Sequence, residues 1–291
     1  YNAMTATRHG EKIMVLGTGN FGTCLAQHLA EQGYQVTMWS RSPETVEAIN
    51  KTHKNPKYLS TITLSKRISA TSNLSSETIA DCSVLVMAIP TQAMRGVLDQ
   101  LKPSIKPAQL IVCANKGIEI GTLKLPTQII GEVLGKDFEK AAVCLSGPSF
   151  AVEVVARQPT AVVAASQTPE RARWAQELFH AAHFRVYTSE DPLGLEIAGA
   201  LKNVMAIATG AAVGIGMQAN AKAALITRGL AEITRVGVAM GANPLTFKGL
   251  SGVGDLFLTC TSEKSRNFRV GYQMGKGKPL EQVIQNMGSV A

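Results

Sequence analysis

The sequence has few aromatic residues, 5% in all, and its lysines and arginines are scattered rather than gathered into a basic run. Proteins that bind nucleic acid present clustered positive charge and aromatic rings on which bases stack, so these two deficits argue against nucleic acid. The formal net charge of +8 still points to an anionic partner. Small phosphorylated ligands suit a scattered positive charge best, and we expect the partner to be of that kind.

Metal and disulfide patterns are also missing from the sequence. The five cysteines are odd in number, widely spaced and mostly set in apolar runs, with no CxxC pair among them. Buried thiols in a reducing cytosol explain this pattern, so we expect a cytoplasmic location. No grouping of His and Glu indicates a metal site, and no nucleophile-elbow or catalytic-triad motif occurs.

The N-terminus lacks the apolar core of an export signal, because residues 1–11 are mostly polar. Tyr1-Asn2-Ala3 ahead of Met4 is interpreted as a cloning remnant, and the predicted fold does not include it. The length of 291 residues is enough for two domains with sizeable cores.

Residues 12–26 hold the most informative stretch. Residues 13–16 are an uninterrupted apolar run, as expected of a parallel strand covered on both faces. Gly17, Gly19 and Gly22 follow at G-x-G-x-x-G spacing and lead into an Ala- and Leu-rich helix. In a dinucleotide site the first glycine permits a tight turn, the second lets the backbone approach a pyrophosphate, and the third lets the helix pack close to the strand. A purely structural turn is the alternative.

A second strand at residues 35–39 completes a βαβ unit and ends at the position that distinguishes NAD from NADP. An acidic residue there would bind the adenine ribose and repel a 2′-phosphate. The sequence has Ser40 and Arg41 instead, which favours NADPH without excluding NADH. The alternative is that Arg41 is a solvated surface residue.

Further buried strands are predicted at residues 84–89, 110–114, 141–145, 160–165 and 184–187, with helices at 91–101 and 170–180. This alternation predicts an α/β fold with a Rossmann-type, doubly wound and mostly parallel sheet. Lys116 and the turn with Gly147 and Ser149 follow strand ends, where ligands bind in such folds. A solvated lysine and an ordinary turn are the alternatives. Residues 50–74 are polar and contain a proline, so they are expected to be loop with short pieces of regular structure.

Strands stop near Asp191, which divides the chain into a nucleotide-binding domain at 1–191 and an all-helical substrate-binding and catalytic domain at 192–291. Residues 204–219 are uncharged, but they are fewer than the ~20 residues that a membrane span needs. Lys202 and Asn203 separate them from the apolar run before them. We expect a buried helix and no integral membrane segment.

Lys202 is the side chain best suited to chemistry, because it interrupts an apolar helix. It must reach solvent, pair with an acid, or lose its proton more easily through desolvation. In a dehydrogenase it can exchange a proton with the oxygen on the carbon that receives hydride. Asp255 can cap a helix, orient a lysine or bind a substrate hydroxyl, and the sequence leaves these open. Arg266 can hold a phosphate through two hydrogen bonds.

Seven motifs, in this order, make the chain resemble one family. They are Gly17-Thr-Gly-Asn-Phe-Gly-Thr23, Ile89-Pro-Thr-Gln92, Asn115-Lys-Gly117, Leu145-Ser-Gly-Pro-Ser-Phe-Ala151, Ala200-Leu-Lys-Asn203, Gly252-Val-Gly-Asp-Leu256 with Leu258-Thr-Cys260, and Ser265-Arg-Asn267. Through them the chain resembles the bacterial-type NAD(P)-dependent glycerol-3-phosphate dehydrogenases over nearly its whole length.

The resemblance implies reversible hydride transfer between glycerol 3-phosphate and dihydroxyacetone phosphate, a step that supplies phospholipid synthesis. It also implies a homodimer and a helical second domain of the 6-phosphogluconate dehydrogenase type. Lys202 then corresponds to the proton donor and acceptor. The implied substrate contacts are Lys116, Gly147, Ser149, Lys202, Asp255, Ser265, Arg266 and Asn267. The cofactor contacts are the turn glycines Gly17, Gly19 and Gly22, together with the implied Asn20, Phe21, Arg41, Lys116, Ala151 and Arg266.

The chain departs from the family at its end. It stops at residues 287–291, where the family continues with an acidic cofactor contact and further helix, so the helical domain reads as truncated and that contact falls on no residue here. Two other functions stay open. A reductase of another small keto acid or imine, such as a ketopantoate-type enzyme, would not need a substrate phosphate. A non-catalytic NADP(H)-sensing module would need neither Lys202 nor Arg266, which argues against it.

Overall fold

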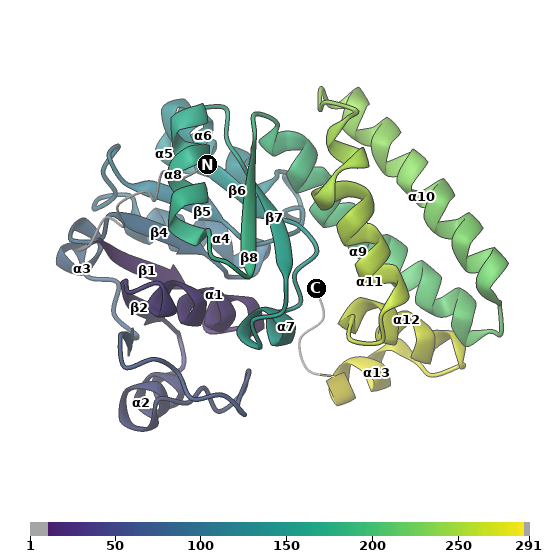
Figure 1. The fold of residues 1–291 in the computed structure, drawn as a ribbon, viewed down its shortest axis with the longest axis horizontal. Helices are drawn as coiled ribbons and strands as arrows, with labels where there is room; N and C mark the ends of the chain where they lie inside the picture. The colour runs from purple at the N-terminus through teal and green to yellow at the C-terminus, as the bar shows by residue number, and fades with distance from the viewer. Residues whose placement is uncertain (1–10, 288–291) are drawn as a thin grey trace. The chain divides into compact units, whose positions relative to one another are not determined.

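The computed structural model describes residues 11–287, so Tyr1-Asn2-Ala3 and residues 288–291 lie outside the described residues. The chain divides into two compact units, drawn in Figure 1. Unit 1 takes its residues from Tyr1–Leu145 and Ser149–Pro192. Unit 2 takes its residues from Ser146–Pro148 and Leu193–Ala291.

Unit 1 is built on an eight-stranded sheet with the strand order β3-β2-β1-β4-β5-β6-β7-β8. The strands are β1 (Lys12–Leu16), β2 (Gln35–Trp39), β3 (Ile68–Thr71), β4 (Val84–Met87), β5 (Leu110–Cys113), β6 (Val143–Ser146), β7 (Thr160–Ala165) and β8 (Phe184–Ser189). The pairs β1–β2, β1–β4, β2–β3, β4–β5, β5–β6 and β7–β8 are all parallel. The predicted doubly wound, parallel sheet is therefore confirmed.

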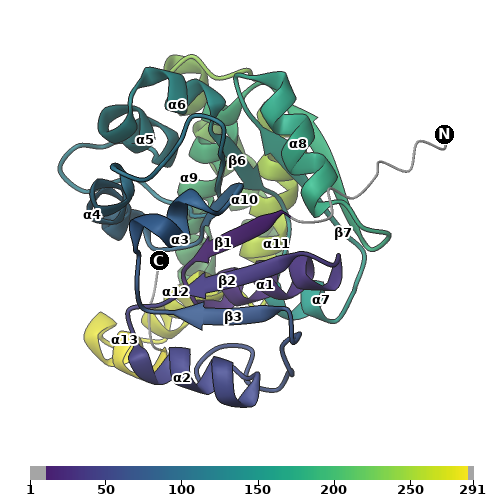
Figure 2. The same ribbon diagram turned by 90° about the vertical axis from the view of Figure 1, so that its left-hand side faces the viewer.

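Helices cover both faces of this sheet, as Figure 2 shows. They are α1 (Asn20–Glu31), α2 (Pro43–Thr52), α3 (Ser76–Ala80), α4 (Thr91–Leu101), α5 (Pro126–Leu134), α6 (Lys136–Ala141), α7 (Ala151–Val155) and α8 (Pro169–Phe179). Ile13 and Val15 of β1 belong to the core under α1 and α8, whereas Met14 and Leu16 belong to the core under α4 and α5. Because successive residues of a strand point to opposite faces, an unbroken apolar run suits a sheet buried on both sides.

Residues 50–74 are mainly loop with short pieces of regular structure, as expected. Helix α2 extends to Thr52, and residues 68–71 form β3, which pairs with β2 at the edge of the sheet. The four residues of β3 alternate between buried and more exposed positions, and two of them are Ser69 and Thr71. Such a short, half-polar strand has little apolar signal in the sequence, and its position is fixed by pairing with β2.

Unit 2 contains helices and no strand among its described residues after Ser146–Pro148, as predicted for the C-terminal part. Its elements are α9 (Pro192–Gly214), α10 (Ala219–Ala239), the 3-10 turn η1 (Thr246–Lys248), the π-helical turn η2 (Leu250–Gly254), α11 (Asp255–Thr261), α12 (Arg266–Gly275) and α13 (Leu280–Met287). Helix α9 runs without a break through Lys202 and Asn203, the two polar residues between its apolar runs.

Helix α9 is, among the described helices, the one long and apolar enough to cross a membrane by length and composition alone. Half of its most apolar window is buried inside the protein. Glu196 and Lys202 on the same helix are also buried, with 5% and 8% of their surface exposed. Buried charged side chains of this kind are typical of a helix in the core of a folded protein.

All five cysteines are free and buried, which confirms the prediction of buried thiols. Burial raises the pKa of Cys24 to about 12. It also raises the pKa of Cys260 to about 11. These thiols are therefore protonated near neutral pH, and protonated thiols are poor nucleophiles and metal ligands.

Helices α9 and α12 cross at a point where four glycines face the opposite backbone. A Cβ at Gly210 would lie 2.0 Å from the carbonyl oxygen of Phe268, and one at Gly214 would lie 2.5 Å from that of Tyr272. From α12, a Cβ at Gly271 would lie 1.9 Å from the Ile207 oxygen, and one at Gly275 would lie 2.4 Å from the Ala211 oxygen. The two backbones are thus closer than any side chain allows, which fixes the crossing of α12, the helix that begins at Arg266, against α9, which carries Lys202.

A glycine-to-alanine change at this crossing and one away from it should have opposite effects on the free energy of unfolding. Gly271→Ala should lower the free energy of unfolding by about 1–3 kcal/mol or more, because the new methyl group meets backbone rather than a movable side chain. Gly96→Ala, in the interior of α4 with open space around the Cβ position, should raise it by about 0.5–1 kcal/mol. Urea denaturation of both variants measures this. Equal effects of the two changes would mean that the helices can separate freely.

Candidate active site

The glycine turn after β1 has two glycines that packing requires and one that leaves the backbone open. Gly17 has a φ of +119°, and a Cβ there would lie 2.5 Å from the carbonyl oxygen of Ala88. A Cβ at Gly22 would lie 2.3 Å from the Gly17 oxygen. Around Gly19, in contrast, a Cβ would meet nothing within 4 Å. The open backbone at the middle glycine is what a pyrophosphate needs in order to approach.

Helix α1 begins directly at this turn, with Gly19 as its N-cap and Asn20 and Phe21 as its first residues. The first N–H groups of a helix have no intrahelical acceptor and carry partial positive charge. The first turn of α1 holds no acidic residue that would oppose an anion. The residues present therefore fit the pyrophosphate of a dinucleotide.

The end of β2 is polar and has no carboxylate before α2. Ser40 accepts a hydrogen bond from the Thr18 hydroxyl at 3.0 Å and another from the backbone N–H of Ser42 at 3.2 Å. Ser42 in turn caps α2, and the side chain of Arg41 is exposed. The structure thus brings the Ser40 hydroxyl to the glycine turn, and Arg41 follows it with an exposed side chain.

Lys116 follows β5 in a loop that is tied to the start of α4. The Asn115 amide donates to the Thr91 hydroxyl at 3.5 Å and contacts the Met94 sulfur. Gly117 has a φ of +140°, and a Cβ there would come within 3.2 Å of the same Thr91 hydroxyl. The Oδ1 atom of Asn115 is buried and has no hydrogen-bond partner within the protein.

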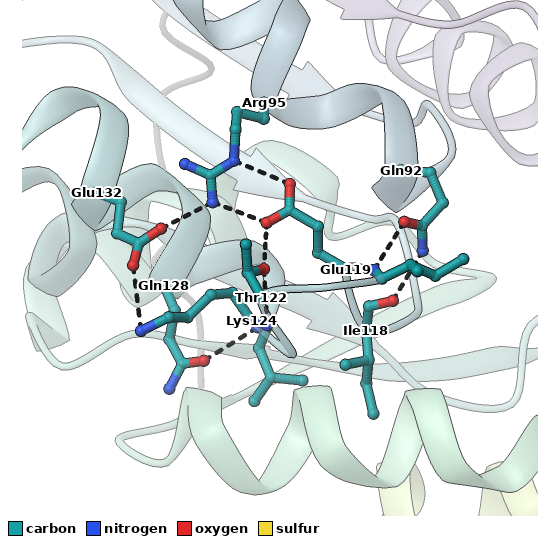
Figure 3. A network of polar contacts seen from close by, with 10 residues as sticks. Gln92, Arg95, Ile118, Glu119, Thr122, Lys124, Gln128 and Glu132 are labelled. Atoms are coloured by element: carbon teal, nitrogen blue, oxygen red, sulfur yellow. Dashed lines mark hydrogen bonds and ion pairs between the residues drawn. The ribbon is translucent and has the colours of Figure 1, made fainter.

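Residues 118–124 continue this loop and are held by a polar network, shown in Figure 3. The Gln92 amide accepts from the N–H of Ile120 at 2.9 Å and donates to the carbonyl of Ile118 at 2.8 Å. Arg95 binds Glu119 with two hydrogen bonds, of 3.0 and 2.7 Å. Arg95 also donates to Glu132 of α5 at 2.7 Å. The loop that carries Lys116 is therefore fixed to both α4 and α5.

The guanidinium of Arg95 lowers the pKa of Glu119, with a smaller contribution from the Thr122 hydroxyl. The Glu119 side chain is only 9% exposed. A buried carboxylate is stable only with such partners, so the ion pair helps to hold the loop in one conformation near neutral pH.

Unit 2 buries a lysine that is paired with an acid. Lys202 Nζ donates to Asp255 Oδ1 at 2.7 Å and to the Thr259 hydroxyl at 2.8 Å. Thr259 donates to the backbone carbonyl of Asp255 at 2.6 Å. Asp255 is 2% exposed and Lys202 is 8% exposed. The sequence left three possibilities for Lys202: reaching solvent, pairing with an acid, or losing its proton. The structure shows pairing with an acid. Asp255, for its part, orients this lysine.

The π-helical turn η2 directly precedes Asp255 and sets its position. A Cβ at Gly252 would lie 2.1 Å from the Phe247 carbonyl oxygen, so the turn packs directly on backbone. The Ser251 hydroxyl donates to the carbonyl oxygen of Ser146 at 3.1 Å. This bond anchors η2 to the turn that contains Gly147, which has a φ of +150°. The Oγ atom of Ser146 is buried without a partner.

Helix α12 begins with the predicted Ser265, Arg266 and Asn267. Ser265 is the N-cap and accepts from the N–H of Phe268 at 3.2 Å. Asn267 is 7% exposed, and its Oδ1 atom has no hydrogen-bond partner within the protein. A buried acceptor without a partner is costly, which marks this position as one where a ligand hydroxyl can bind.

The predicted site residues divide between the two units. Unit 1 holds Gly17, Gly19, Asn20, Phe21, Gly22, Arg41, Lys116, Ser149 and Ala151, and unit 2 holds Gly147, Lys202, Asp255, Ser265, Arg266 and Asn267. The sequence reasoning missed Thr259, although its i,i+4 spacing from Asp255 on one helix could have indicated it. It also missed Arg95 and Glu119, which are 24 residues apart and carry no common motif.

The Arg95–Glu119 pair predicts a pH-dependent loss of stability in Glu119→Gln. Because the folded-state pKa is lowered, the pair stabilises the protein above the ordinary glutamate value of 4.5, and this contribution is lost as the pH falls through the lowered value. Near neutral pH the variant should lose about 1–3 kcal/mol of unfolding free energy, and in acid the difference should shrink.

Urea denaturation at both pH values measures this difference. Glu47→Gln, which removes an exposed pair with Lys51 on α2, is the matched control and should have almost no effect. Equal losses in the two variants would contradict a structural role for Glu119.

Two family models match nearly the whole chain. Residues 12–172 match the family model described as NAD-dependent glycerol-3-phosphate dehydrogenase N-terminus, and residues 191–291 match that of its C-terminus. The glycerol-3-phosphate dehydrogenase (NAD(P)+) of Limosilactobacillus reuteri is 47% identical over 283 residues, covering 96% of this chain and 83% of that protein. The protein of the same name from Oceanobacillus iheyensis is 48% identical over 280 residues, covering 96% and 80%.

Solved structures agree with the sequence comparison. The crystal structure of glycerol-3-phosphate dehydrogenase from Coxiella burnetii matches with a TM-score of 0.90 and 35% identity, covering 96% of this chain and 85% of that one. The yeast enzyme structure matches with a TM-score of 0.82 and 31% identity, covering 96% and 86%. These matches confirm the resemblance carried by the motifs, and the chain belongs to the NAD-dependent glycerol-3-phosphate dehydrogenase family.

Proposed function

We propose that this chain reduces dihydroxyacetone phosphate reversibly to sn-glycerol 3-phosphate, using NADPH in preference to NADH. The observation that carries the proposal is the buried Lys202–Asp255 pair of unit 2, in a chain whose unit 1 has an open glycine turn at the start of α1. We assign the cofactor-binding domain to residues 1–191 and the substrate-binding and catalytic domain to residues 192–291, with a few contacts to each ligand supplied by the other domain.

The cofactor contacts of the proposal are the glycine turn, Asn20, Phe21, Arg41, Lys116, Ala151 and Arg266. Bound NAD(P)H supplies the hydride that reduces the ketone carbon. The N–H groups at the start of α1 receive the pyrophosphate, and no side chain is needed for this. The preference for NADPH rests on Arg41, which is exposed at the end of β2 with no acidic neighbour in β2 to repel a 2′-phosphate.

Lys202 is the proposed proton donor to the substrate oxygen. As the ketone carbon becomes tetrahedral, negative charge develops on that oxygen, and an ammonium group in a buried site stabilises it strongly. Asp255 and Thr259 fix the direction of the ammonium from one side, at 2.7 and 2.8 Å. Transfer of the Nζ proton to the oxygen completes the alcohol, and the reverse transfer starts its oxidation.

Arg266 and Asn267 are the proposed contacts that select a phosphorylated substrate. A guanidinium can bind two phosphate oxygens at once, and Arg266 stands in the first turn of α12, where the helix dipole also favours an anion. The unpartnered Asn267 Oδ1 accepts a substrate hydroxyl. Lys116, Gly147, Ser149 and Ser265 complete the proposed substrate contacts.

The setting of the reaction is also part of the proposal. The product supplies the backbone of phospholipids, and the protein acts in the cytoplasm as a homodimer. Free, buried thiols fit a reducing compartment, and the dimer and the metabolic role are supported by the family resemblance.

The activity and the role of Lys202 can be tested together. The wild type should consume NADPH, and NADH less efficiently, when dihydroxyacetone phosphate is added. Lys202→Ala should lower kcat by about 10²-fold or more and leave the Kd for NADPH unchanged, because the amine acts on substrate oxygen.

Lys222→Ala, on α10 of the same unit, is the matched control and should retain the wild-type kcat. An unchanged kcat in Lys202→Ala would contradict the proton-transfer role. A wild type that binds NADPH and reduces no phosphorylated ketone would instead indicate a sensing module.

The phosphate requirement separates this activity from that of a keto acid or imine reductase. Arg266→Ala should raise the KM for dihydroxyacetone phosphate by about 10- to 100-fold, since it removes hydrogen bonds to a charged group. Turnover of unphosphorylated dihydroxyacetone should be poor in the wild type and should change little in the variant. Steady-state kinetics with both ketones measures this. Efficient reduction of the unphosphorylated ketone by the wild type would favour the alternative reductase.

A further inference from the structure

Asn55 lies in an irregular segment between α2 and β3 and yet is completely buried, with 0% of its surface exposed. Its amide makes four hydrogen bonds, which is all that an asparagine side chain can readily make. Nδ2 donates to the carbonyl oxygen of Thr18 and to the hydroxyl of Thr23, both at 2.8 Å. Oδ1 accepts from the N–H groups of Lys57 and Tyr58, at 3.0 and 3.1 Å.

Two of these bonds reach the glycine turn. Thr18 stands between Gly17 and Gly19, and its carbonyl oxygen accepts from Asn55 and also from the Thr23 hydroxyl, at 3.2 Å. Thr23 is itself buried in the second turn of α1, with 0% exposed. The carbonyl of the turn is therefore held on its inner side by two donors, one from α1 and one from a segment more than thirty residues further along the chain.

The direction of this carbonyl decides the direction of the next N–H group. A peptide bond is planar, and in the trans form its C=O and N–H point in opposite directions. The described chain contains no cis peptide bond. With the Thr18 oxygen turned inward to Asn55, the N–H of Gly19 must point the opposite way. The backbone at Gly19 is also open, since a Cβ there would meet nothing within 4 Å.

We propose that Asn55 is a positioning residue of the dinucleotide site, which directs the Gly19 N–H toward the cofactor pyrophosphate by holding the Thr18 carbonyl. This inference deepens the proposed function and rests on it. Asn55 does not touch the cofactor itself. It removes the alternative in which the Thr18–Gly19 peptide rotates and presents a carbonyl oxygen to the phosphate, which would repel it.

Asn55→Asp is the sharpest variant, because it keeps the shape and the acceptor for Lys57 and Tyr58 but replaces the donors to the turn by a carboxylate oxygen that repels the Thr18 oxygen. Asn55→Ala removes the same donors without adding a charge. Asn50→Asp is the matched control. The Asn50 amide also bridges backbone groups, donating to the Ala70 carbonyl at 2.9 Å and accepting from its N–H at 2.7 Å, and within the described residues it makes no hydrogen bond to the glycine turn.

The measurement is the Kd of the full chain for NADPH, for ADP-ribose, which carries the pyrophosphate, and for adenosine, which lacks it. Both Asn55 variants should bind NADPH and ADP-ribose about tenfold or more weakly, the effect of losing one hydrogen bond to a charged group. Adenosine binding should be unchanged, and Asn50→Asp should bind all three ligands as the wild type does. With isotope-labelled glycine, addition of ADP-ribose should shift the Gly19 amide resonance in the wild type and shift it less in Asn55→Ala.

Acid should partly restore Asn55→Asp, because a protonated carboxyl group can again donate to the Thr18 oxygen, and it should not restore Asn55→Ala. Unchanged Kd values for ADP-ribose in folded Asn55 variants would overturn the positioning role and leave the proposed function intact. A wild type that binds neither NADPH nor NADH would instead overturn the proposed function. If one variant fails to fold, the other still decides the question.

Discussion

The buried ion pair between Lys202 and Asp255 is the interaction that the helices of unit 2 enclose and hold in place. Each of these charges loses several kcal/mol of hydration when it is buried, and only a close and well-directed partner offsets this loss. The 2.7 Å contact and the Thr259 hydroxyl supply that partner. An apolar pair of similar volume would be at least as stable on general grounds, so we infer that the charges serve the chemistry rather than the fold.

Close backbone contacts in unit 2 give this pair a fixed frame. Gly252 lets η2 pack against the backbone of Phe247 and so sets the start of α11 at Asp255. The four glycines at the crossing of α9 and α12 leave no room for sliding between the helix of Lys202 and that of Arg266. Backbone-to-backbone contacts are less adaptable than contacts between flexible side chains, which suits groups that must act on one small substrate.

The sequence predicted the buried strands and the glycine turn, because both depend on local pattern. For Lys202 it gave pairing with an acid as one of three possibilities. Strand β2 and helix α4 were predicted at their observed limits, since both have strong apolar periodicity between clear end signals. The edge strand β3 falls in a segment expected to be loop with short pieces, and its place in the sheet was not predicted because it comes from pairing with β2 rather than from its own residues. The roles of Asn55 and of the Arg95–Glu119 pair could not be predicted for a similar reason. Single polar residues form no hydrophobic pattern, and their hydrogen-bond partners are distant in the sequence.

The hydrogen bond from the Thr18 hydroxyl to Ser40 links the turn after β1 to the end of β2. Altering nucleotide preference in such folds commonly means placing an acid at the end of this second strand. At Ser40 that exchange would put a carboxylate against the hydroxyl of the turn and beside the N–H of Ser42, so selectivity and turn geometry would change together. Arg41, exposed one residue later, is free of this coupling to Thr18 in the described contacts. Coenzyme choice, in evolution or in the laboratory, can therefore be changed at Arg41 with less disturbance of the glycine turn than at Ser40.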